Sequence, residues 1–321
     1  MTDLRSKIVK QFGNVVPENQ EVSKPTEMIS TNIMSFDHAL GGGIPRGHIT
    51  HLWGPDGAGK TTSMIPLIHS AQKIGTTVYI ALEPKINPAY FIGRGVDPDK
   101  TVFVKTMSKN DVLHGNKAMD LIREVAEDCV LIVLDSVAGL TPSVVYDMDS
   151  GDIAMAKVAA LLAYQLPVIS NIVAATNTAL VMINQQRASF EQYGMDTKPF
   201  AGYAILHWVS INAWMRSSGW IKDGGATVGF KTKVTTNKNT LAPPRRTAEW
   251  SIMFDTGIDY VEETFMFARK AGIISTGGGY IKMGNVELNH PGERGIDDAL
   301  ARVRAEPDLY DAIVKEIVDG N

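Results

Sequence analysis

The sequence predicts an α/β protein with a mainly parallel sheet, an antiparallel extension of that sheet, an N-terminal helix and a small C-terminal α+β lobe. Two observations lead to this prediction. From about residue 28 onward, short apolar runs alternate with segments of helical spacing, which is typical of a doubly wound sheet. After residue 203, three strand-like segments follow one another across short polar links, which favours antiparallel pairing.

The individual elements follow from the apolar pattern. The apolar runs are continuous rather than alternating, as expected of parallel strands that are covered on both faces. Helical spacing is found at 60–74, 111–127 and 152–175. We expect parallel strands at 49–53, 78–82, 102–104, 130–134 and 179–184, and strands of the extension at 209–215, 228–236 and 248–254.

The chain divides into three predicted parts. Apolar residues within 3–12 share one helical face, and a polar stretch with two prolines follows them. Residues 1–30 are therefore predicted to be a helix and linker outside the main core. The helix docks either on its own chain or on a neighbouring protomer, and the contact with a neighbouring protomer is the one we expect. Residues 31–258 form the predicted core. Residues 259–321 form the predicted C-terminal lobe, with two or three short helices around the glycines at 277–279.

Composition excludes several classes of protein. The 321 residues are 44% hydrophobic and 21% charged, so the chain is globular rather than disordered or collagen-like. The net charge of −4 means that any nucleic-acid binding depends on a local patch. The single cysteine, Cys129, excludes an intramolecular disulfide and fits a reducing compartment. The absence of a long apolar run predicts a soluble intracellular protein without a membrane partner.

The strongest motif is a phosphate-binding loop of the form G-x-x-x-x-G-K-[ST], placed between a predicted strand and a predicted helix. Its backbone N–H groups and the helix N-terminus suit phosphate groups. Lys60 is expected to reach the β- and γ-phosphates, and Thr61 to bind Mg²⁺. The predicted ATP-binding residues of the loop are Gly54, Pro55, Asp56, Gly57, Ala58, Gly59, Lys60, Thr61 and Thr62.

Three polar residues follow predicted strands and should meet at the carboxyl edge of the sheet. Asp135 ends a buried apolar run, where Mg²⁺ at Thr61 is its natural partner. Glu83 is placed to orient and deprotonate an attacking water. Gln185 can hydrogen-bond the γ-phosphate without adding charge. On position alone, each of the three is also compatible with a polar cap or a solvated residue at a strand end.

Several motifs in order resemble RecA-type homologous recombinases, including a phage-encoded branch. They are residues 35–47, 54–62, 135–142, 183–187 and 237–243. The resemblance implies a RecA-like P-loop ATPase core that binds ATP and Mg²⁺. It implies that Glu83 is the catalytic glutamate and that Gln185 senses the γ-phosphate and signals to the segment that follows it.

The resemblance also assigns residues around the nucleotide. Tyr90 falls where an aromatic ring stacks on adenine, and Asn87 where a residue that is usually acidic contacts the base. Lys238 matches one of two lysines that reach the γ-phosphate of the neighbouring protomer, as an arginine finger does. The second of these lysines is Thr240 here. The expected catalytic set is therefore Glu83, Lys60, Gln185 and Lys238.

Two loops match DNA-binding elements of the family. The loop at about 145–152 is acidic here, so it would act through shape or backbone contacts. The segment at about 186–202 interleaves basic and aromatic residues, which suits stacking on single-stranded DNA, although the residues alone also fit an ordinary exposed loop. A basic stretch follows at 222–246. The expected DNA-binding residues are Arg187, Phe190, Tyr193, Lys198, Phe200 and Gly202.

These features predict a DNA-dependent ATPase that forms head-to-tail filaments on single-stranded DNA, pairs them with homologous duplex and exchanges strands. Its expected location is the cytoplasm, that of the host cell if a phage encodes it. One alternative is a RecA-fold motor or mediator, such as a hexameric helicase. A second is a scaffold that binds ATP without turnover, against which the intact Lys60, Thr61, Asp135 and Glu83 argue.

Overall fold

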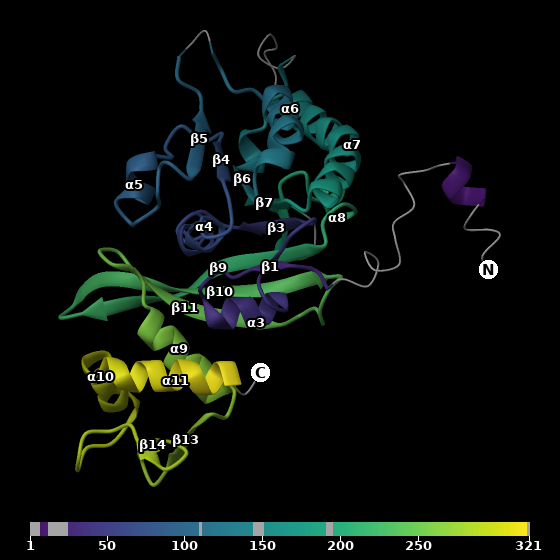
Figure 1. Cartoon of the computed structure of the whole chain (residues 1–321). Helices are drawn as coiled ribbons and strands as arrows, with labels where there is room; N and C mark the ends of the chain where they lie inside the picture. Colours follow the sequence, from purple (N-terminus) through teal and green to yellow (C-terminus); the bar gives the residue numbers. More distant parts are fainter. Residues whose placement is uncertain (1–6, 12–24, 109–110, 144–150, 191–194, 320–321) are drawn as a thin grey trace.

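The computed structural model describes residues 7–11, 25–108, 111–143, 151–190 and 195–319. Its centre is a ten-stranded sheet with the order β12-β11-β10-β9-β3-β7-β6-β4-β5, in which β8 pairs with β7 (Figure 1). The six strands from β9 to β5 run parallel. They are β3 (Ile49–Gly54), β4 (Thr77–Ala81), β5 (Thr101–Lys105), β6 (Leu131–Asp135), β7 (Ala179–Phe190) and β9 (Ile211–Asp223).

The predicted antiparallel extension is present. β10 pairs antiparallel with both β9 and β11, and β11 pairs antiparallel with β12. The first strand of the extension, β9, is also parallel to β3, so it joins the two halves of the sheet. The fold-class prediction is confirmed. The antiparallel strands of the extension are β10 (Ala226–Asn239), β11 (Thr247–Met253) and β12 (Gly257–Ile258). The tenth strand of the sheet, β8 (Met195–Pro199), pairs with β7.

Helices cover both faces of the sheet, as continuous apolar strands require. Because successive side chains of a strand point to opposite faces, Val133 and Val181 join one apolar cluster, whereas Ile132 and Leu180 join the other. The first cluster lies under α3 (Met34–Leu40), α4 (Met64–Ala71) and α5 (Pro88–Ile92). The second lies under α6 (Gly115–Val125), α7 (Gly151–Thr176) and α8 (Gly202–Leu206), with 3₁₀ turns at Ala126–Asp128 and Val137–Gly139.

Helix α7 is long and apolar enough, by composition, to span a membrane over Ala156–Thr176. Its residues Leu162, Leu166 and Ile169 are fully buried and belong to the second apolar cluster. One side of α7 therefore packs against the sheet, and 33% of the apolar window is buried.

The C-terminal segment has an apolar cluster of its own, which includes Phe265, Ile281 and Ile313. It lies beyond the extension end of the sheet (Figure 1). Gly277 ends one strand, and Gly278 and Gly279 form the turn to the next. The described part of this segment holds a three-stranded sheet and three helices. Its elements are α9 (Tyr260–Lys270), β13 (Ile274–Gly277), β14 (Tyr280–Met283), β15 (Val286–Glu287), α10 (Ile296–Ala305) and α11 (Pro307–Asp319).

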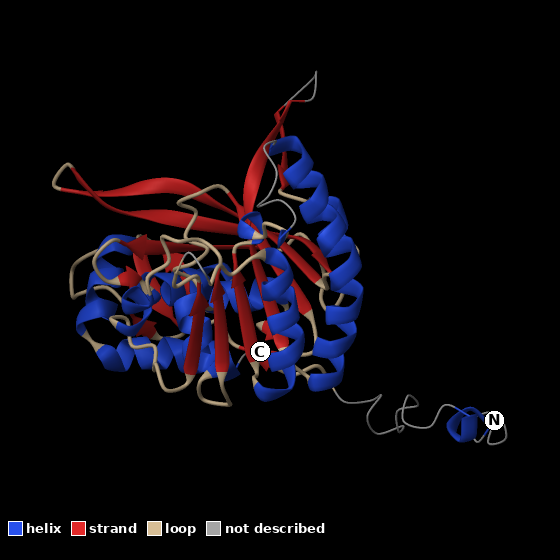
Figure 2. Cartoon of the chain, turned by 90° about the horizontal axis from the view of Figure 1, so that it is seen from above, coloured by secondary structure: helices blue, strands red, loops and turns tan. Residues whose placement is uncertain are grey.

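At the other end of the chain, residues 7–11 are helical and stand apart from the main body (Figure 2). Their apolar side chains Ile8 and Val9 are 38% and 42% exposed. A small sheet of β1 (Met28–Ile29) and β2 (Ile44–Pro45) opens the core. The division at residues 30 and 258 stays a prediction.

The segment 186–202 differs from the flexible loop that the sequence led us to expect. β7 continues to Phe190 and pairs antiparallel with β8, which makes a hairpin that projects from the sheet (Figure 2). β8 supplies the backbone partners that this part of β7 needs once it has left the parallel sheet. Residues 191–194 and most of the 145–152 loop lie outside the described residues.

Candidate active site

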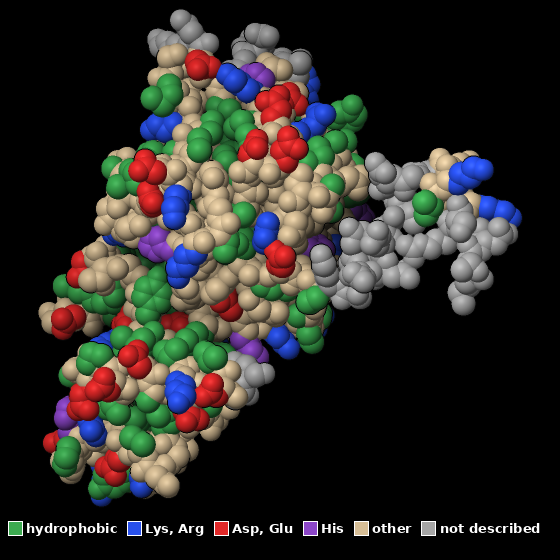
Figure 3. All heavy atoms as spheres, viewed as in Figure 1, with side chains coloured by type: hydrophobic (Ala, Val, Ile, Leu, Met, Phe, Trp, Pro, Cys, Tyr) green, Lys and Arg blue, Asp and Glu red, His purple; other side chains and the backbone are tan. Residues whose placement is uncertain are grey.

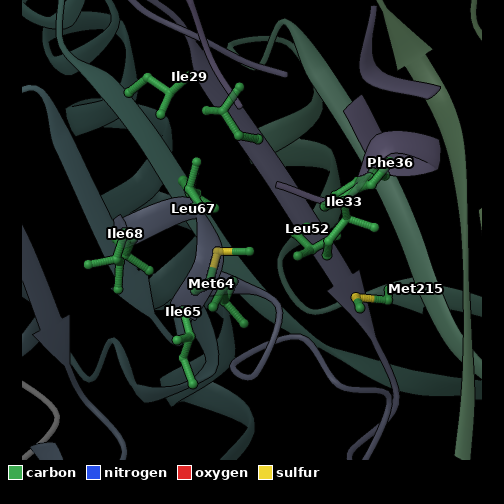
Figure 4. Close-up of a cluster of buried hydrophobic side chains, with 14 of the residues drawn as sticks. Ile29, Ile33, Phe36, Leu52, Met64, Ile65, Leu67, Ile68 and Met215 are labelled. Carbon is green, nitrogen blue, oxygen red and sulfur yellow. The ribbon is translucent and has the colours of Figure 1, made fainter. Parts of the chain in front are cut away.

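The phosphate-binding loop leaves the carboxyl end of β3 at Gly54, where only a glycine fits. A Cβ at Gly54 would lie 1.8 Å from the Met215 carbonyl oxygen of β9. Gly59 has φ +83°, a left-handed conformation, and a Cβ there would meet Ile252 Cδ1 at 2.5 Å. The helix that follows is anchored by Met64, Leu67 and Ile68, which pack in the same cluster as Leu52 of β3 (Figure 4).

Lys60 lies within this loop and is only 8% exposed. Its Nζ donates to the carbonyl oxygens of Gly54 and Pro55 at 2.9 and 2.7 Å. Burial lowers the pKa of Lys60, while the carboxylates of Asp56, Asp135 and Glu83 act in the opposite direction. The ammonium group is thus held inside the loop that was predicted to bind phosphate.

Thr61 and Asp135, the two predicted metal ligands, are in direct contact. The Thr61 hydroxyl donates to Asp135 Oδ2 at 2.8 Å, and the buried Tyr79 hydroxyl donates to the same oxygen at 2.5 Å. Asp135 is 2% exposed, and burial raises its pKa despite these two hydrogen bonds. The hydrogen bonds of this carboxylate within the described residues therefore come from neutral hydroxyls.

This donor set fits Mg²⁺. A buried carboxylate oxygen and a threonine hydroxyl are hard oxygen ligands, and Mg²⁺ typically takes one or two protein ligands while phosphates and water supply the rest. No group of three His, Cys, Asp or Glu side chains gathers into a metal-binding cluster in the described part of the chain. Thr61 and Asp135 therefore suit a Mg²⁺ ion whose remaining ligands come from a nucleotide and from water.

Glu83 follows β4 and lies at the same edge of the sheet. Register places Ala81 beside Asp135, and Gly54 beside Gln185. Glu83 Oε1 accepts hydrogen bonds from Ser136 Oγ at 2.7 Å and from Gln185 Nε2 at 3.1 Å. The structure thus brings together Glu83, Gln185, Thr61, Asp135 and Lys60, as the sequence predicted.

Lys85 is a further neighbour of Glu83. Its Nζ lies 2.9 Å from Glu83 Oε2, and the Lys85 side chain is 67% exposed, whereas that of Glu83 is 16% exposed. Burial raises the pKa of Glu83, but hydrogen bonds from Lys85, Ser136 and Gln185 outweigh it and hold the pKa below its ordinary value. Glu83 is therefore an ionised carboxylate at neutral pH.

Comparison with known proteins identifies the family. Residues 2–259 match the RecA N-terminal domain family. This chain belongs to the RecA family. Protein RecA of Haemophilus ducreyi is 32% identical over 97% of this chain and 83% of its own length. Protein RecA of Thermus aquaticus is 33% identical over 97% of this chain and 91% of its own length.

As a member of the RecA family, the protein is a DNA-dependent ATPase and strand-exchange recombinase. Members bind ATP and DNA and form filaments. Neither the family match nor these relatives favour the alternative of a RecA-fold motor or mediator.

The predicted adenine residues lie beside the RecA phosphate loop. The Tyr90 hydroxyl is 3.3 Å from Thr62 Oγ1, and the Tyr90 side chain is 38% exposed. Asn87 is the N-cap of α5, where its side chain accepts from the Ala89 backbone N–H at 3.0 Å. The guanidinium of Arg94 lies 3.8 Å over the Tyr90 ring. Arg94 therefore places a cation beside Tyr90, the predicted adenine-stacking residue.

Lys238 lies apart from the phosphate loop of its own chain. Its Nζ donates to the Leu206 carbonyl oxygen at the end of α8, at 2.8 Å. Thr240 is exposed, and its backbone N–H donates to the Ser210 carbonyl oxygen. Within the basic stretch, Lys231 forms an ion pair with Glu262. On the face in Figure 3, acidic and basic side chains are interspersed.

Of the predicted DNA-binding residues, Arg187, Phe190 and Lys198 lie on the strands of the β7–β8 hairpin. Arg187 pairs with Lys198, and Phe190 pairs with Met195, in its backbone ladder. Phe200 is 6% exposed and belongs to the second apolar cluster. Gly202 opens α8, and a Cβ there would meet the Pro199 ring at 2.6 Å. The structure thus places Phe200 in the core, and Tyr193 lies outside the described residues.

Four partners of the site were missed by sequence reasoning. Tyr79 and Ser136 bind the two carboxylates, Lys85 pairs with Glu83, and Arg94 covers Tyr90. The position of Lys85, two residues after the predicted general base, was the one available signal. Tyr79 and Ser136 reach carboxylates that lie more than 50 residues away in the chain, whereas Arg94 follows Tyr90 by four residues.

Proposed function

We propose that ATP and Mg²⁺ bind at the 54–62 loop, that Thr61 and Asp135 hold the metal, and that Glu83 activates the attacking water. The observation that carries this proposal is the contact of Glu83 with Gln185 at the edge of the sheet where Thr61 meets Asp135. The Asp135 carboxylate is thereby available to a metal ion, and the Glu83 carboxylate to a water molecule.

Each residue has a separate part in hydrolysis. Bound Mg²⁺ would neutralise charge on the phosphate oxygens. Lys60 would exchange its two carbonyl partners for phosphate oxygens, which is favourable because the ammonium would then face negatively charged acceptors rather than neutral carbonyl oxygens. Glu83 would accept the proton of the water that attacks the γ-phosphorus. Its lowered pKa keeps the carboxylate ionised at neutral pH, which is the form that a general base needs.

Gln185 would report DNA binding to this centre. It lies where β7 leaves the sheet to form the hairpin, and its amide donates to the general base. Single-stranded DNA bound by Arg187, Phe190, Tyr193 and Lys198 would therefore pull on a residue that positions Glu83. Phe200 would contribute to DNA contact only if it left the apolar cluster, whereas Gly202 permits the tight entry into α8.

Assembly would complete the site. Lys238 is held away from its own phosphate loop, which suits the proposed contact with the γ-phosphate of a neighbouring protomer in a head-to-tail filament. The exposed helix around Ile8 would dock on that neighbour. The assembled filament would bind single-stranded DNA and homologous duplex DNA. It would act in the cytoplasm. Leu4→Asp with Ile8→Asp should reduce assembly, and unchanged sedimentation with ATP and single-stranded DNA would exclude this docking.

The rate of ATP hydrolysis with and without single-stranded DNA tests the proposal. We expect strong stimulation by DNA in the unchanged protein and loss of all turnover in Lys60→Ala. Turnover that is indifferent to DNA would break the link between the hairpin and the phosphate site. Turnover that survives in Lys60→Ala would place hydrolysis elsewhere.

A further inference from the structure

Polar and aromatic side chains lie on one face of three adjacent strands, β7, β3 and β9. Trp53 of β3 pairs in register with Asn184 of β7 on one side and with Trp214 of β9 on the other. The two tryptophan rings are 5.9 Å apart. Trp214 Nε1 donates to the side-chain oxygen of Gln186 at 3.0 Å. Trp214 therefore joins β9 to the first residue of the hairpin.

A second, fully buried row lies deeper in the sheet. His51 Nδ1 is 2.9 Å from Asn212 Oδ1, and Asn184 Nδ2 is 3.1 Å from His51 Nε2. Asn184 Nδ2 also donates to the Phe200 carbonyl oxygen at 2.7 Å, and the Phe200 N–H donates to the Gln185 carbonyl oxygen. Hydrogen bonds through His51 of β3 thus connect the base of the 186–200 hairpin, at Asn184 and Phe200, to Asn212 of β9.

The Gln186 contact has a consequence for its neighbour Gln185. Successive side chains of a strand point to opposite faces, so a strand whose Gln186 is fixed toward Trp214 presents Gln185 toward Glu83. Loss of that tether removes the side-chain contact that fixes Gln186, and the 3.1 Å contact of Gln185 with Glu83 is the contact that a change of twist at the end of β7 would lose.

We propose that Trp214 is a positioning residue that keeps Gln185 directed at Glu83 while the hairpin binds DNA. This inference rests on the proposed function, because it assumes that Gln185 couples DNA to hydrolysis. Trp N–H is a donor only and the Gln186 oxygen is its acceptor, so the contact has one geometry. The guanidinium carbon of Arg216, two residues along β9, lies over the Trp214 ring, 5.5 Å from its centroid.

Trp214→Phe tests the proposal because it keeps a ring against Trp53 and removes the N–H. Trp220→Phe is the matched control, since Trp220 lies on the same strand but is 67% exposed. We expect Trp214→Phe to lower the maximal DNA-stimulated rate about fivefold, which corresponds to one neutral hydrogen bond at about 1.4 kcal/mol per factor of ten. Basal turnover and the half-saturating concentration of single-stranded DNA should not change.

The partner residue supplies the second measurement. Gln186→Leu should cause the same loss, and it carries the test by itself if Trp214→Phe does not fold. The double variant should lose no more than either single variant, because both remove one hydrogen bond. Losses that multiply in the double variant would overturn the proposal, as would a Trp214→Phe rate equal to that of Trp220→Phe. An unchanged protein that DNA does not stimulate would instead reject the proposed function.

Discussion

The Thr61 hydroxyl donates to Asp135 Oδ2 over 2.8 Å, although 74 positions separate the two residues in the chain. Tertiary structure therefore brings this pair together. The carboxylate is buried at a cost, because its hydrogen bonds in the described structure come from hydroxyls rather than from a cation. Such a cost at a strand end is consistent with selection for metal binding rather than for stability.

Asp135→Asn should separate the effect of Asp135 on metal binding from its effect on stability. The amide oxygen can still accept from Thr61 and Tyr79, while the buried charge is lost. We expect the Mg²⁺ concentration for half-maximal hydrolysis to rise about tenfold or more, with thermal stability unchanged or higher. Glu249→Gln, at an exposed position, is the control. An unaltered Mg²⁺ dependence would remove Asp135 from the metal site.

Glu83→Gln should abolish most turnover while nucleotide binding persists. General base catalysis contributes about 100-fold or more, and an amide cannot accept the proton of the water. Ser136→Ala removes one hydrogen bond from the same carboxylate and should cost about tenfold or less. Single-turnover hydrolysis and equilibrium binding of a labelled nucleotide check this prediction. Equal losses in the two variants would mean that the carboxylate is structural.

Gln185→Ala should uncouple DNA from hydrolysis. Its amide contacts Glu83 from the base of the hairpin, so its loss leaves the phosphate loop intact and removes the link to DNA. We expect nucleotide binding to persist and stimulation by single-stranded DNA to collapse. The ratio of stimulated to basal rate measures this directly. Normal stimulation in the variant would show that another residue carries the signal.

Lys85→Met should move the acid limb of the pH–rate profile to higher pH. Hydrolysis requires ionised Glu83, so the rate falls as pH falls through the pKa of Glu83. Lys85 helps to lower that pKa, and without Lys85 the opposing effect of burial remains. The matched control is Lys315→Met on α11, where the lysine is exposed and distant. Coincident profiles for the variant and the unchanged protein would exclude the ion pair from catalysis.

The parallel strands were predictable because burial on both faces leaves continuous apolar runs such as 131–134. The far ends of β9 and β10 were not, because beyond residue 216 β9 is largely exposed and its side chains carry no apolar period. The 186–202 hairpin was missed for a related reason. Its strands pair with each other outside the core, so pairing, rather than burial, determines where they run.

The site residues that end parallel strands were predictable from topology alone. Glu83, Asp135 and Gln185 meet because parallel strands deliver their carboxyl ends to one edge. Their partners were not predictable, since Tyr79 and Trp214 resemble core aromatic residues in the sequence. Only the fold shows that each directs a donor at a particular oxygen. For Phe200 the sequence predicted a DNA-binding residue at the surface, whereas the structure buries this side chain in an apolar cluster.

His51 should make the fold sensitive to mild acid. Complete burial lowers the pKa of His51 to about 4 even though Asn212 acts in the opposite direction. Between the ordinary pKa of 6.5 and this value, the unfolded chain takes up a proton that the folded chain refuses, so stability falls as pH falls. From pH 7 to pH 5 this contribution amounts to about 2 kcal/mol.

His51→Gln removes this titration but keeps a donor and an acceptor between Asn184 and Asn212. Urea unfolding at pH 7, 6 and 5 should show a steeper loss of stability in the unchanged protein than in the variant. His207→Gln, at an exposed position of the same chain, should follow the unchanged protein. Parallel curves for His51→Gln and the unchanged protein would mean that the folded state accepts the proton, and that the Asn184–His51–Asn212 row adapts to a charge.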